Sequence, residues 1–225
     1  MTNANTTQLE TDIAIVGGGM VGGVLAWSLA ASGLQVALVD CATLTDAATR
    51  AGERSTALSW GSRQLLDSVG LWADIAADAV AIKRIHVSQQ GHLGAVRMQA
   101  SDHHIDALGY VVRNARVSAC LAQRLPAVDN LKLLAPTQVV SIEQSLHGVQ
   151  LQLNTGQELR TKLLVIADGG DSKTRDLAGL SAEIDDYEQQ AVVATLTSKN
   201  TPADMAWERF TSNGPMALLP IGSDL

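Results

Sequence analysis

Aromatic residues are scarce in this chain of 225 residues, which holds four Trp, two Tyr and one Phe. So few rings argue against a platform on which the bases of single-stranded nucleic acid stack. The net charge of −7 at pH 7 is likewise the opposite of the basic surface that binds a duplex. No stretch reaches the roughly 18 consecutive apolar residues of a membrane-spanning helix. We therefore expect neither a nucleic-acid partner nor a transmembrane segment.

Cysteine and histidine are too few and too scattered to predict a metal site. Cys41 and Cys120 make no C-x-x-C motif, and we expect two reduced thiols, as in a cytoplasmic protein. The adjacent His103 and His104 cannot face the same side of a strand, and no carboxylate cluster accompanies them. A G-x-S-x-G nucleophile motif is also absent, so hydrolase chemistry has no support.

The amino-terminal residues 1–11 lack the basic and apolar regions of a secretory signal, so we expect a disordered leader and a cytoplasmic protein. Hydrophobic residues at 46% and charged residues at 17% indicate a folded globular chain. At roughly 150 residues per domain, the length corresponds to about one and a half domains.

A glycine-rich turn between a strand and a helix dominates the first fifty residues. Apolar, β-branched residues 12–16 predict a strand, which ends at the sequence Gly-Gly-Gly-Met-Val-Gly of residues 17–22. A helical pattern follows over 24–31, and Gly33 is placed to end that helix in a left-handed conformation. A second apolar run, 35–39, ends at Asp40. Strand, glycine turn, helix, strand and acidic residue in this order are typical of a dinucleotide-binding βαβ unit.

The residues of that pattern have distinct physical roles at a dinucleotide. Gly17 permits the tight turn out of the strand, Gly19 lets a pyrophosphate approach the backbone, and Gly22 lets the helix pack closely on the sheet. The amino terminus of the helix offers unpaired N–H groups to the phosphates. Asp40, at the tip of the second strand, can accept hydrogen bonds from ribose hydroxyls. The motif by itself is compatible with FAD and with NAD.

The rest of the chain mixes helices and strands. Residues 47–55 are small and polar and predict a loop that contains Arg54. Helices are expected at 58–71, with a break at Gly70 near its end, and at 117–125 and 174–178. Strands are expected at 82–87, 95–98, 111–112, 131–134, 139–144, 149–154, 157–160, 163–167, 191–197, 207–211 and 216–220.

The strands between residues 139 and 160 predict a β-meander that leads into a second ligand-facing turn. The buried strand 163–167 runs directly into Asp168 and Gly169, and Ser172 is placed to cap the following helix. Ligands of open α/β sheets gather at the carboxyl edge of the strands, so this turn is expected beside the first glycine turn.

Three motifs together make a family resemblance specific. They are the glycine motif at 17–22, the sequence Gly-Glu-Arg-Ser-Thr-Ala-Leu-Ser at 52–59, and the pattern A-D-G-x-x-S-x-x-R at 167–175. With them the chain resembles the FAD-dependent aromatic hydroxylases, the para-hydroxybenzoate hydroxylase-like monooxygenases. Further likeness, to the ubiquinone-biosynthesis branch of that family, lies at 85–92, 107–112 and 207–220.

The resemblance implies an α/β fold: a Rossmann-like FAD-binding domain with a β-meander crossover, and the start of a mixed-sheet substrate domain. In such a protein the glycine motif would hold the FAD pyrophosphate and the acidic residue would bind the adenosine ribose. The arginine would lie near the pyrophosphate and flavin, and the D-G pair would serve FAD and the pyridine nucleotide. The FAD-binding residues so implied are Gly17, Gly19, Gly22, Asp40, Arg54, Asp168, Gly169 and Asn114, with Arg113 as the alternative to the last.

The activity implied by the resemblance is carried by the cofactor. NAD(P)H would reduce the flavin, O2 would add to it as a hydroperoxide, and the distal oxygen would hydroxylate a polyprenylated phenol. No catalytic acid or base is required, and none is assigned. Because a polyprenyl chain partitions into lipid, the implied partners include the surface of the inner membrane, by peripheral contact, or a complex with other ubiquinone-pathway enzymes.

The same resemblance predicts an incomplete enzyme. We expect an FAD-binding domain at 12–80 and 113–182, and part of a substrate domain at 81–112 and 183–225. The family's third motif, G-D-A-x-H-x-x-x-P, has no counterpart in this sequence. We therefore expect a truncated chain that by itself binds FAD weakly or not at all and does not hydroxylate.

Three other interpretations stay open at the level of the sequence. Asp40 also suits the free 2′-OH of NAD in a dehydrogenase, although a β-meander before the Asp168 turn disfavours that class. The chain is alternatively a non-enzymatic fragment that associates through a sheet edge. A third interpretation keeps the FAD-dependent hydroxylase and changes its phenolic substrate.

Overall fold

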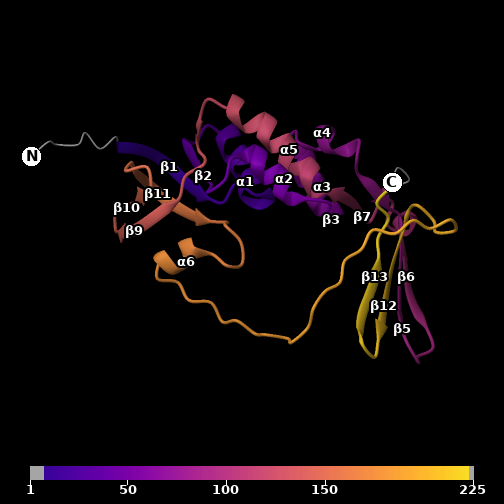
Figure 1. Cartoon of the computed structure of the whole chain (residues 1–225). Coiled ribbons are helices and arrows are strands. Elements are labelled where there is room, and N and C mark those ends of the chain that lie inside the picture. The colour runs from indigo at the N-terminus through magenta and orange to yellow at the C-terminus, as the bar shows by residue number, and fades with distance from the viewer. Residues whose placement is uncertain (1–7, 223–225) are drawn as a thin grey trace, which may run out of the picture. The chain divides into compact units, whose positions relative to one another are not determined.

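The computed structural model describes residues 8–222, which form two compact units (Figure 1). The first unit contains residues 8–52 and 117–186, and the second contains 53–116 and 187–222. Among the described residues, no helix is long and apolar enough to cross a membrane.

A six-stranded mixed sheet forms the centre of the first unit (Figure 1). Its strand order is β8-β2-β1-β11-β10-β9; the first four run parallel, and the last three form an antiparallel meander. The predicted βαβ unit and meander are therefore confirmed. The elements are β1 (Gln8–Val16), α1 (Met20–Ala31), β2 (Val36–Val39), α2 (Leu44–Ala51), α5 (Asn114–Arg124, whose first residues belong to the second unit), the 3-10 helix η2 (Leu125–Ala127), β8 (Leu131–Leu134), β9 (Val139–Ser145), β10 (Gly148–Leu153), β11 (Glu158–Ile166) and α6 (Lys173–Leu177).

The core of the first unit follows from the residue pattern of its strands. β2 reads Val-Ala-Leu-Val and is buried at every position, as expected of a parallel strand covered on both faces. On the meander, Leu151 lies opposite Leu159, and both side chains are fully buried. Gly33, with φ of 88°, follows the end of α1 in the left-handed conformation that stops a helix.

Two sheets build the second unit. One is three-stranded, in the order β3-β7-β4, and the other is four-stranded, in the order β13-β12-β5-β6. The elements are β3 (Ser55–Ser59), α3 (Trp60–Ser68), α4 (Trp72–Ala76), β4 (Val80–Ile82), β5 (Arg84–Gln89), β6 (Ala95–Gln99), the 3-10 helix η1 (Ala100–His103), β7 (Gly109–Arg113), β12 (Met205–Thr211) and β13 (Gly214–Leu218).

Three of the few aromatic residues gather in the second unit. Trp72 meets Tyr110 edge-on, with ring centroids 4.9 Å apart, and Trp60 stacks on the same Tyr at 6.5 Å. The guanidinium of Arg63 lies 5.3 Å from the Trp60 ring and 5.4 Å from the Trp72 ring. Contacts of this kind are worth about 0.5–1 kcal/mol each at exposed sites, so the cluster fastens α3 and α4 to β7.

Two strand boundaries in the first unit differ from prediction. β1 begins at Gln8, so residues 8–11, expected in the leader, pair with β11; residues 1–7 lie outside the described part. The strands expected at 157–160 and 163–167 are one strand, β11. They are continuous because β1 pairs with β11 along its length, while β10 covers only the first half.

Four other predicted elements differ from the structure in whole or in part, because the local sequence pattern did not decide the backbone conformation there. The loop expected at 47–55 is confirmed only at 52–54, since α2 occupies Leu44–Ala51 and is capped by Thr43, which accepts from the Asp46 N–H at 3.1 Å. The helix expected over 58–71 is shorter, α3 at Trp60–Ser68, because Leu58 belongs to β3; the break expected at Gly70, with φ of 75°, is confirmed and precedes α4. Residues 191–197 form no strand, and the strand expected at 82–87 is divided between β4 and β5.

The two units do not coincide with the expected domain limits. Residues 53–80 and 113–116, expected in an FAD-binding domain, group with the second unit by their contacts. The functional division into an FAD-binding domain and a substrate domain stays a prediction.

Leu159 tests the core of the first unit. We expect Leu159→Ala to lower the free energy of unfolding by about 2–5 kcal/mol, because the change leaves a cavity opposite Leu151. Leu146→Ala, at a side chain that is fully exposed, is the matched control and should stay within about 0.5 kcal/mol of the wild type. Urea unfolding measures both; equal effects of the two substitutions would contradict the assignment.

The ion pair between Arg84 and Asp204 gives the second unit an acid-sensitive contribution. The Arg84 guanidinium holds the pKa of Asp204 below its ordinary value of 3.8. A carboxyl whose pKa is lowered on folding stabilises the fold above its unfolded pKa, and this stability is lost as pH falls through the folded value.

We therefore expect Asp204→Asn to cost a fraction of a kcal/mol at neutral pH, because the pair is partly exposed. The cost should shrink in urea titrations as the pH falls below 3.8, because Asp204 then takes up a proton in the folded protein and the ion pair is lost. The exposed Asp106→Asn is the control and should show no such pH-dependent difference. A cost of Asp204→Asn that is the same at pH 7 and at low pH would count against the ion pair.

Candidate functional site

The carboxyl ends of β1, β2 and β11 meet at one edge of the first unit's sheet. Val16, the last residue of β1, pairs with Val39 of β2 on one side and with Ile166 of β11 on the other. The segments that follow these three strands therefore start side by side. They contain six of the eight residues predicted to bind a dinucleotide: Gly17, Gly19, Gly22, Asp40, Asp168 and Gly169.

Gly17 connects all three strand ends through its backbone. Its N–H donates to the carbonyl of Val39 at 2.8 Å, and its φ is 107°, in the region that favours glycine. A Cβ at Gly17 would lie 2.3 Å from the carbonyl oxygen of Ala167, which follows β11. No side chain fits at this position, so the turn requires glycine.

Gly22 allows the helix to approach the turn closely. A Cβ at Gly22 would lie 1.9 Å from the carbonyl oxygen of Gly17 and 3.2 Å from the Cβ of Ala167. The next residue is similarly restricted, since a Cβ at Gly23 would lie 2.8 Å from Leu121 Cδ1 of α5. Gly23 was not among the residues predicted from the sequence. The signal available there was the doubled glycine at the start of a helix.

Gly19 differs from Gly17 and Gly22, the other two glycines of the motif, because a Cβ there would meet no atom within 4 Å. Its backbone is extended, with φ of −67° and ψ of −171°, and it caps α1 without any side-chain hydrogen bond. The first turn of this twelve-residue helix contains no acidic residue. Open space in front of uncapped helical N–H groups is suited to a phosphate group.

Asp40 joins the first glycine turn to the segment after β2. One carboxylate oxygen, Oδ2, accepts from the N–H of Gly18 at 2.5 Å, and the other, Oδ1, accepts from the N–H of Ala42 at 2.8 Å. The sequence did not reveal the contribution of Gly18. A carboxylate oxygen has more than one acceptor site, so each can still accept a hydrogen bond from a ribose hydroxyl.

The turn after β11 places Asp168 and Gly169 at the same edge of the sheet. The Asp168 side chain is exposed, and its Oδ2 accepts from the N–H of Thr174 at 3.4 Å. Gly169 has φ of 101°, so glycine is favoured there. Ser172 caps α6, as predicted, by accepting from the N–H of Arg175 at 2.9 Å.

The remaining two predicted residues, Arg54 and Asn114, lie together in the second unit. The N–H of Asn114 donates to the carbonyl of Arg54 at 2.9 Å, next to the pairing of β3 with β7. The Thr56 hydroxyl donates to Asn114 Oδ1 at 2.7 Å and fixes that side chain. The Arg54 side chain is exposed, and so is that of Arg113, the alternative to Asn114. The eight residues thus form one group of six and one pair.

The group of six has features that suit the pyrophosphate and ribose of a dinucleotide. The space over Gly19 would be filled by a Cβ, the N–H groups of α1 begin beside it, and Asp40 retains acceptor capacity. Among the described residues there is no cluster of three or more His, Cys, Asp or Glu that could hold a metal ion.

Comparison with known proteins agrees with this geometry. The family model described as "FAD binding domain" matches residues 10–224. The chain is 33% identical to the 3-demethoxyubiquinol 3-hydroxylase of Escherichia coli K12, over 96% of this chain and 56% of that protein. It is also 33% identical to the ubiquinone hydroxylase UbiL of Rhodospirillum rubrum, over 93% of this chain and 49% of that protein. The chain thus spans about half the length of the curated relatives it matches.

Among solved structures, the chain is similar in fold to PqsL of P. aeruginosa in complex with 2-aminobenzoylacetate. The TM-score is 0.79 at 24% identity, and the match covers 96% of this chain and 59% of that one. This likeness supports the arrangement of strands and helices described above.

Gly19 and Gly22 should respond differently to the same substitution. We expect Gly19→Ala to leave the free energy of unfolding within about 0.5 kcal/mol of wild type, since its Cβ meets no atom, while FAD affinity falls at least about tenfold. Gly22→Ala should destabilise the fold by about 1–3 kcal/mol or more, because its Cβ overlaps the Gly17 carbonyl.

Gly61→Ala is the matched control for both substitutions. Gly61 lies in α3 with room for a Cβ, so alanine there should stabilise by up to about 1 kcal/mol and leave FAD binding unchanged. Urea unfolding and quenching of flavin fluorescence, in the protein at its natural length, measure the two properties. Unchanged FAD affinity in Gly19→Ala would show that the pyrophosphate does not lie over Gly19.

Proposed function

The chain belongs to the FAD binding domain family, and on that premise we propose that it is part of an FAD-dependent monooxygenase that hydroxylates a polyprenylated phenol in ubiquinone biosynthesis. The observation that carries the proposal is the family match over residues 10–224, together with the glycine geometry of the β1–α1 turn. The name of the E. coli relative, a 3-demethoxyubiquinol 3-hydroxylase, supports the ubiquinone branch.

We assign the pyrophosphate of FAD to the β1–α1 turn. Gly17 and Gly22 keep that turn closed, and Gly19 leaves the space in which the phosphates approach the N–H groups of α1. Asp40 accepts hydrogen bonds from the adenosine ribose with the acceptor sites that Gly18 and Ala42 leave unused. These assignments locate the adenosine half of the cofactor in the first unit.

The other predicted residues receive roles at the reactive half of the cofactor. Asp168 and Gly169, at the end of β11, serve FAD and the pyridine nucleotide. Arg54 provides a positive charge near the pyrophosphate and flavin, and Asn114, fixed by the Thr56 hydroxyl, provides a polar contact. Proton transfer is assigned to no side chain of this chain.

FAD, when bound, supplies the redox chemistry: it accepts electrons from NAD(P)H and activates O2 for transfer of one oxygen atom to the ring. The protein's part is to bind and orient the ring and to exclude water. We place the substrate-binding function in the regions predicted for it, 81–112 and 183–225, and FAD binding in 12–80 and 113–182. A polyprenylated substrate also favours peripheral contact with the inner membrane or a complex with other enzymes of the pathway.

Substrate-stimulated oxidation of NAD(P)H tests the proposal. The protein at its natural length, loaded with FAD, should consume NAD(P)H and O2 faster when a polyprenylated phenol is added, and mass spectrometry should show a product one oxygen atom heavier. Gly61→Ala should retain this activity, and Gly19→Ala should lose it in proportion to its loss of FAD. Stimulation only by phenols without a prenyl chain would show that the substrate belongs to that class instead. Turnover without flavin would overturn the proposal.

A further inference from the structure

The four-stranded sheet of the second unit packs over part of one face, while Val96 and Phe210 farther along that face are 60% and 46% exposed. Ile85 and Ala206 pair across β5 and β12 and pack in a cluster with Ile82 and Val111. Because side chains alternate along a strand, the residues next to them point to the opposite side. We call that side the outer face; it carries His86, Arg97, Trp207, Arg209, Met216 and Leu218.

The register of the strands arranges these side chains in rows across the outer face. In one row, Arg97 on β6 pairs with His86 on β5. His86 pairs with Trp207 on β12, and Trp207 with Leu218 on β13. In the next row Arg209 lies between Ser88 and Met216. Basic groups therefore occupy β6, β5 and β12, and apolar groups occupy β13.

A groove of about 380 Å³ lies on the outer face. His86, Trp207, Arg209, Met216 and Leu218 contribute to its lining, and residues 200–202 line it as well. Met216 is 58% exposed and Leu218 is 48% exposed. Such side chains cost free energy in water, so the groove offers apolar surface to a partner.

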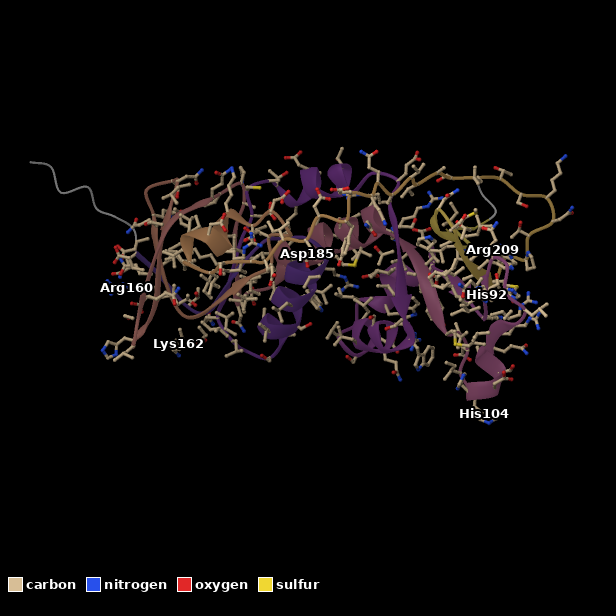
Figure 2. All side chains as sticks on the ribbon, turned by 90° about the horizontal axis from the view of Figure 1, so that it is seen from below. His92, His104, Arg160, Lys162, Asp185 and Arg209 are labelled. Atoms are coloured by element: carbon tan, nitrogen blue, oxygen red, sulfur yellow. The ribbon has the colours of Figure 1, made fainter. Side chains whose placement is uncertain are left out.

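The outer face carries the arginines Arg97 and Arg209 in a chain whose net charge is −7, and Arg209 lines the groove. Within residues 8–222, Arg97 and Arg209 form no ion pair, whereas Arg84 on the same face is bonded to Asp204. Glu208 also borders the groove, but alternation along β12 directs its carboxylate to the opposite side. Figure 2 shows the side chain of Arg209 on this sheet. The outer face thus carries local positive charge although the net charge of the chain is negative.

We propose that the outer face docks on a bilayer that contains anionic phospholipid. Arg97 and Arg209 attract the headgroup phosphates, and Met216 and Leu218 enter the boundary of the acyl chains. Trp207 lies between them, at the depth where an indole is favoured in a membrane interface. A nucleic acid is a poorer match, because two arginines neutralise few phosphates and Met216 and Leu218 would gain no partner.

The biological sense of this surface rests on the proposed function, since a polyprenylated phenol resides in lipid. The physical evidence for it does not, because charge and exposure on the outer face are independent of FAD. Vesicle binding can therefore succeed or fail separately from hydroxylation.

Vesicle flotation tests the surface directly. The protein at its natural length should float with phosphatidylcholine vesicles that contain one-third phosphatidylglycerol and remain unbound to pure phosphatidylcholine. Raising the salt concentration from about 0.05 M to about 0.5 M should release it, because the Debye length shortens. The double substitution Arg97→Gln/Arg209→Gln should weaken the partition coefficient on the order of 20-fold, about fivefold for each charge.

The matched control removes two positive charges elsewhere. Arg160→Gln/Lys162→Gln changes two residues of β11 in the first unit, both labelled in Figure 2, and should weaken binding no more than about twofold. Brominated lipid should quench tryptophan fluorescence on binding, and Trp207→Phe should remove that quenching. This second readout does not depend on removing a charge.

Several results would overturn the proposal. They are no flotation with anionic vesicles, equal weakening by the two double substitutions, or quenching that persists in Trp207→Phe. Displacement by inorganic phosphate at constant ionic strength would identify a site for a soluble phosphate instead. Flotation with no hydroxylation would contradict the proposed function while supporting the surface, and hydroxylation with no flotation would do the reverse.

Discussion

Three stretches of backbone meet without an intervening side chain where Gly17 lies against Ala167 and Gly22. The two hypothetical Cβ positions fall 2.3 Å and 1.9 Å from carbonyl oxygens, so neither glycine can be replaced without moving the strands or the helix. Because this contact sets the distance between α1 and the ends of β1 and β11, the positions of Gly19, Asp40 and Asp168 all depend on it. The open space at Gly19 is thus a product of close packing on either side.

Asp40 extends that constraint to the next strand. Its two carboxylate oxygens accept from Gly18 and Ala42, so the segment after β2 is tied to the first glycine turn before any nucleotide binds. Charge-assisted hydrogen bonds of this kind are stronger than neutral ones. In the second unit, one backbone hydrogen bond joins Asn114 to Arg54, and the Thr56 hydroxyl fixes the Asn114 side chain.

The parts of the fold that could be predicted are those with a local cause. Gly33 ends α1 and Ser172 starts α6 by effects that act within a few residues, and the β-meander shows in the alternation of β9 and β10. The strand predicted at 191–197 failed because β-branched residues indicate a preference for extended backbone, but not whether a partner strand is available. The glycine motif could be recognised for the same local reason, whereas the bond from Gly18 to Asp40 depends on the placement of a side chain 22 residues away.

The parallel pairing of β1 with β11 has a consequence for the order in which the chain becomes structured during its synthesis. Asp12 on β1 and Lys162 on β11 bond to each other across 150 residues of sequence. A ribosome exposes the glycine turn early, yet that turn lacks its neighbour until nearly three-quarters of these residues have been made. Loop closure over such a length is slow compared with local helix formation. During that interval β1 presents an unpaired edge, which can pair with other chains and aggregate.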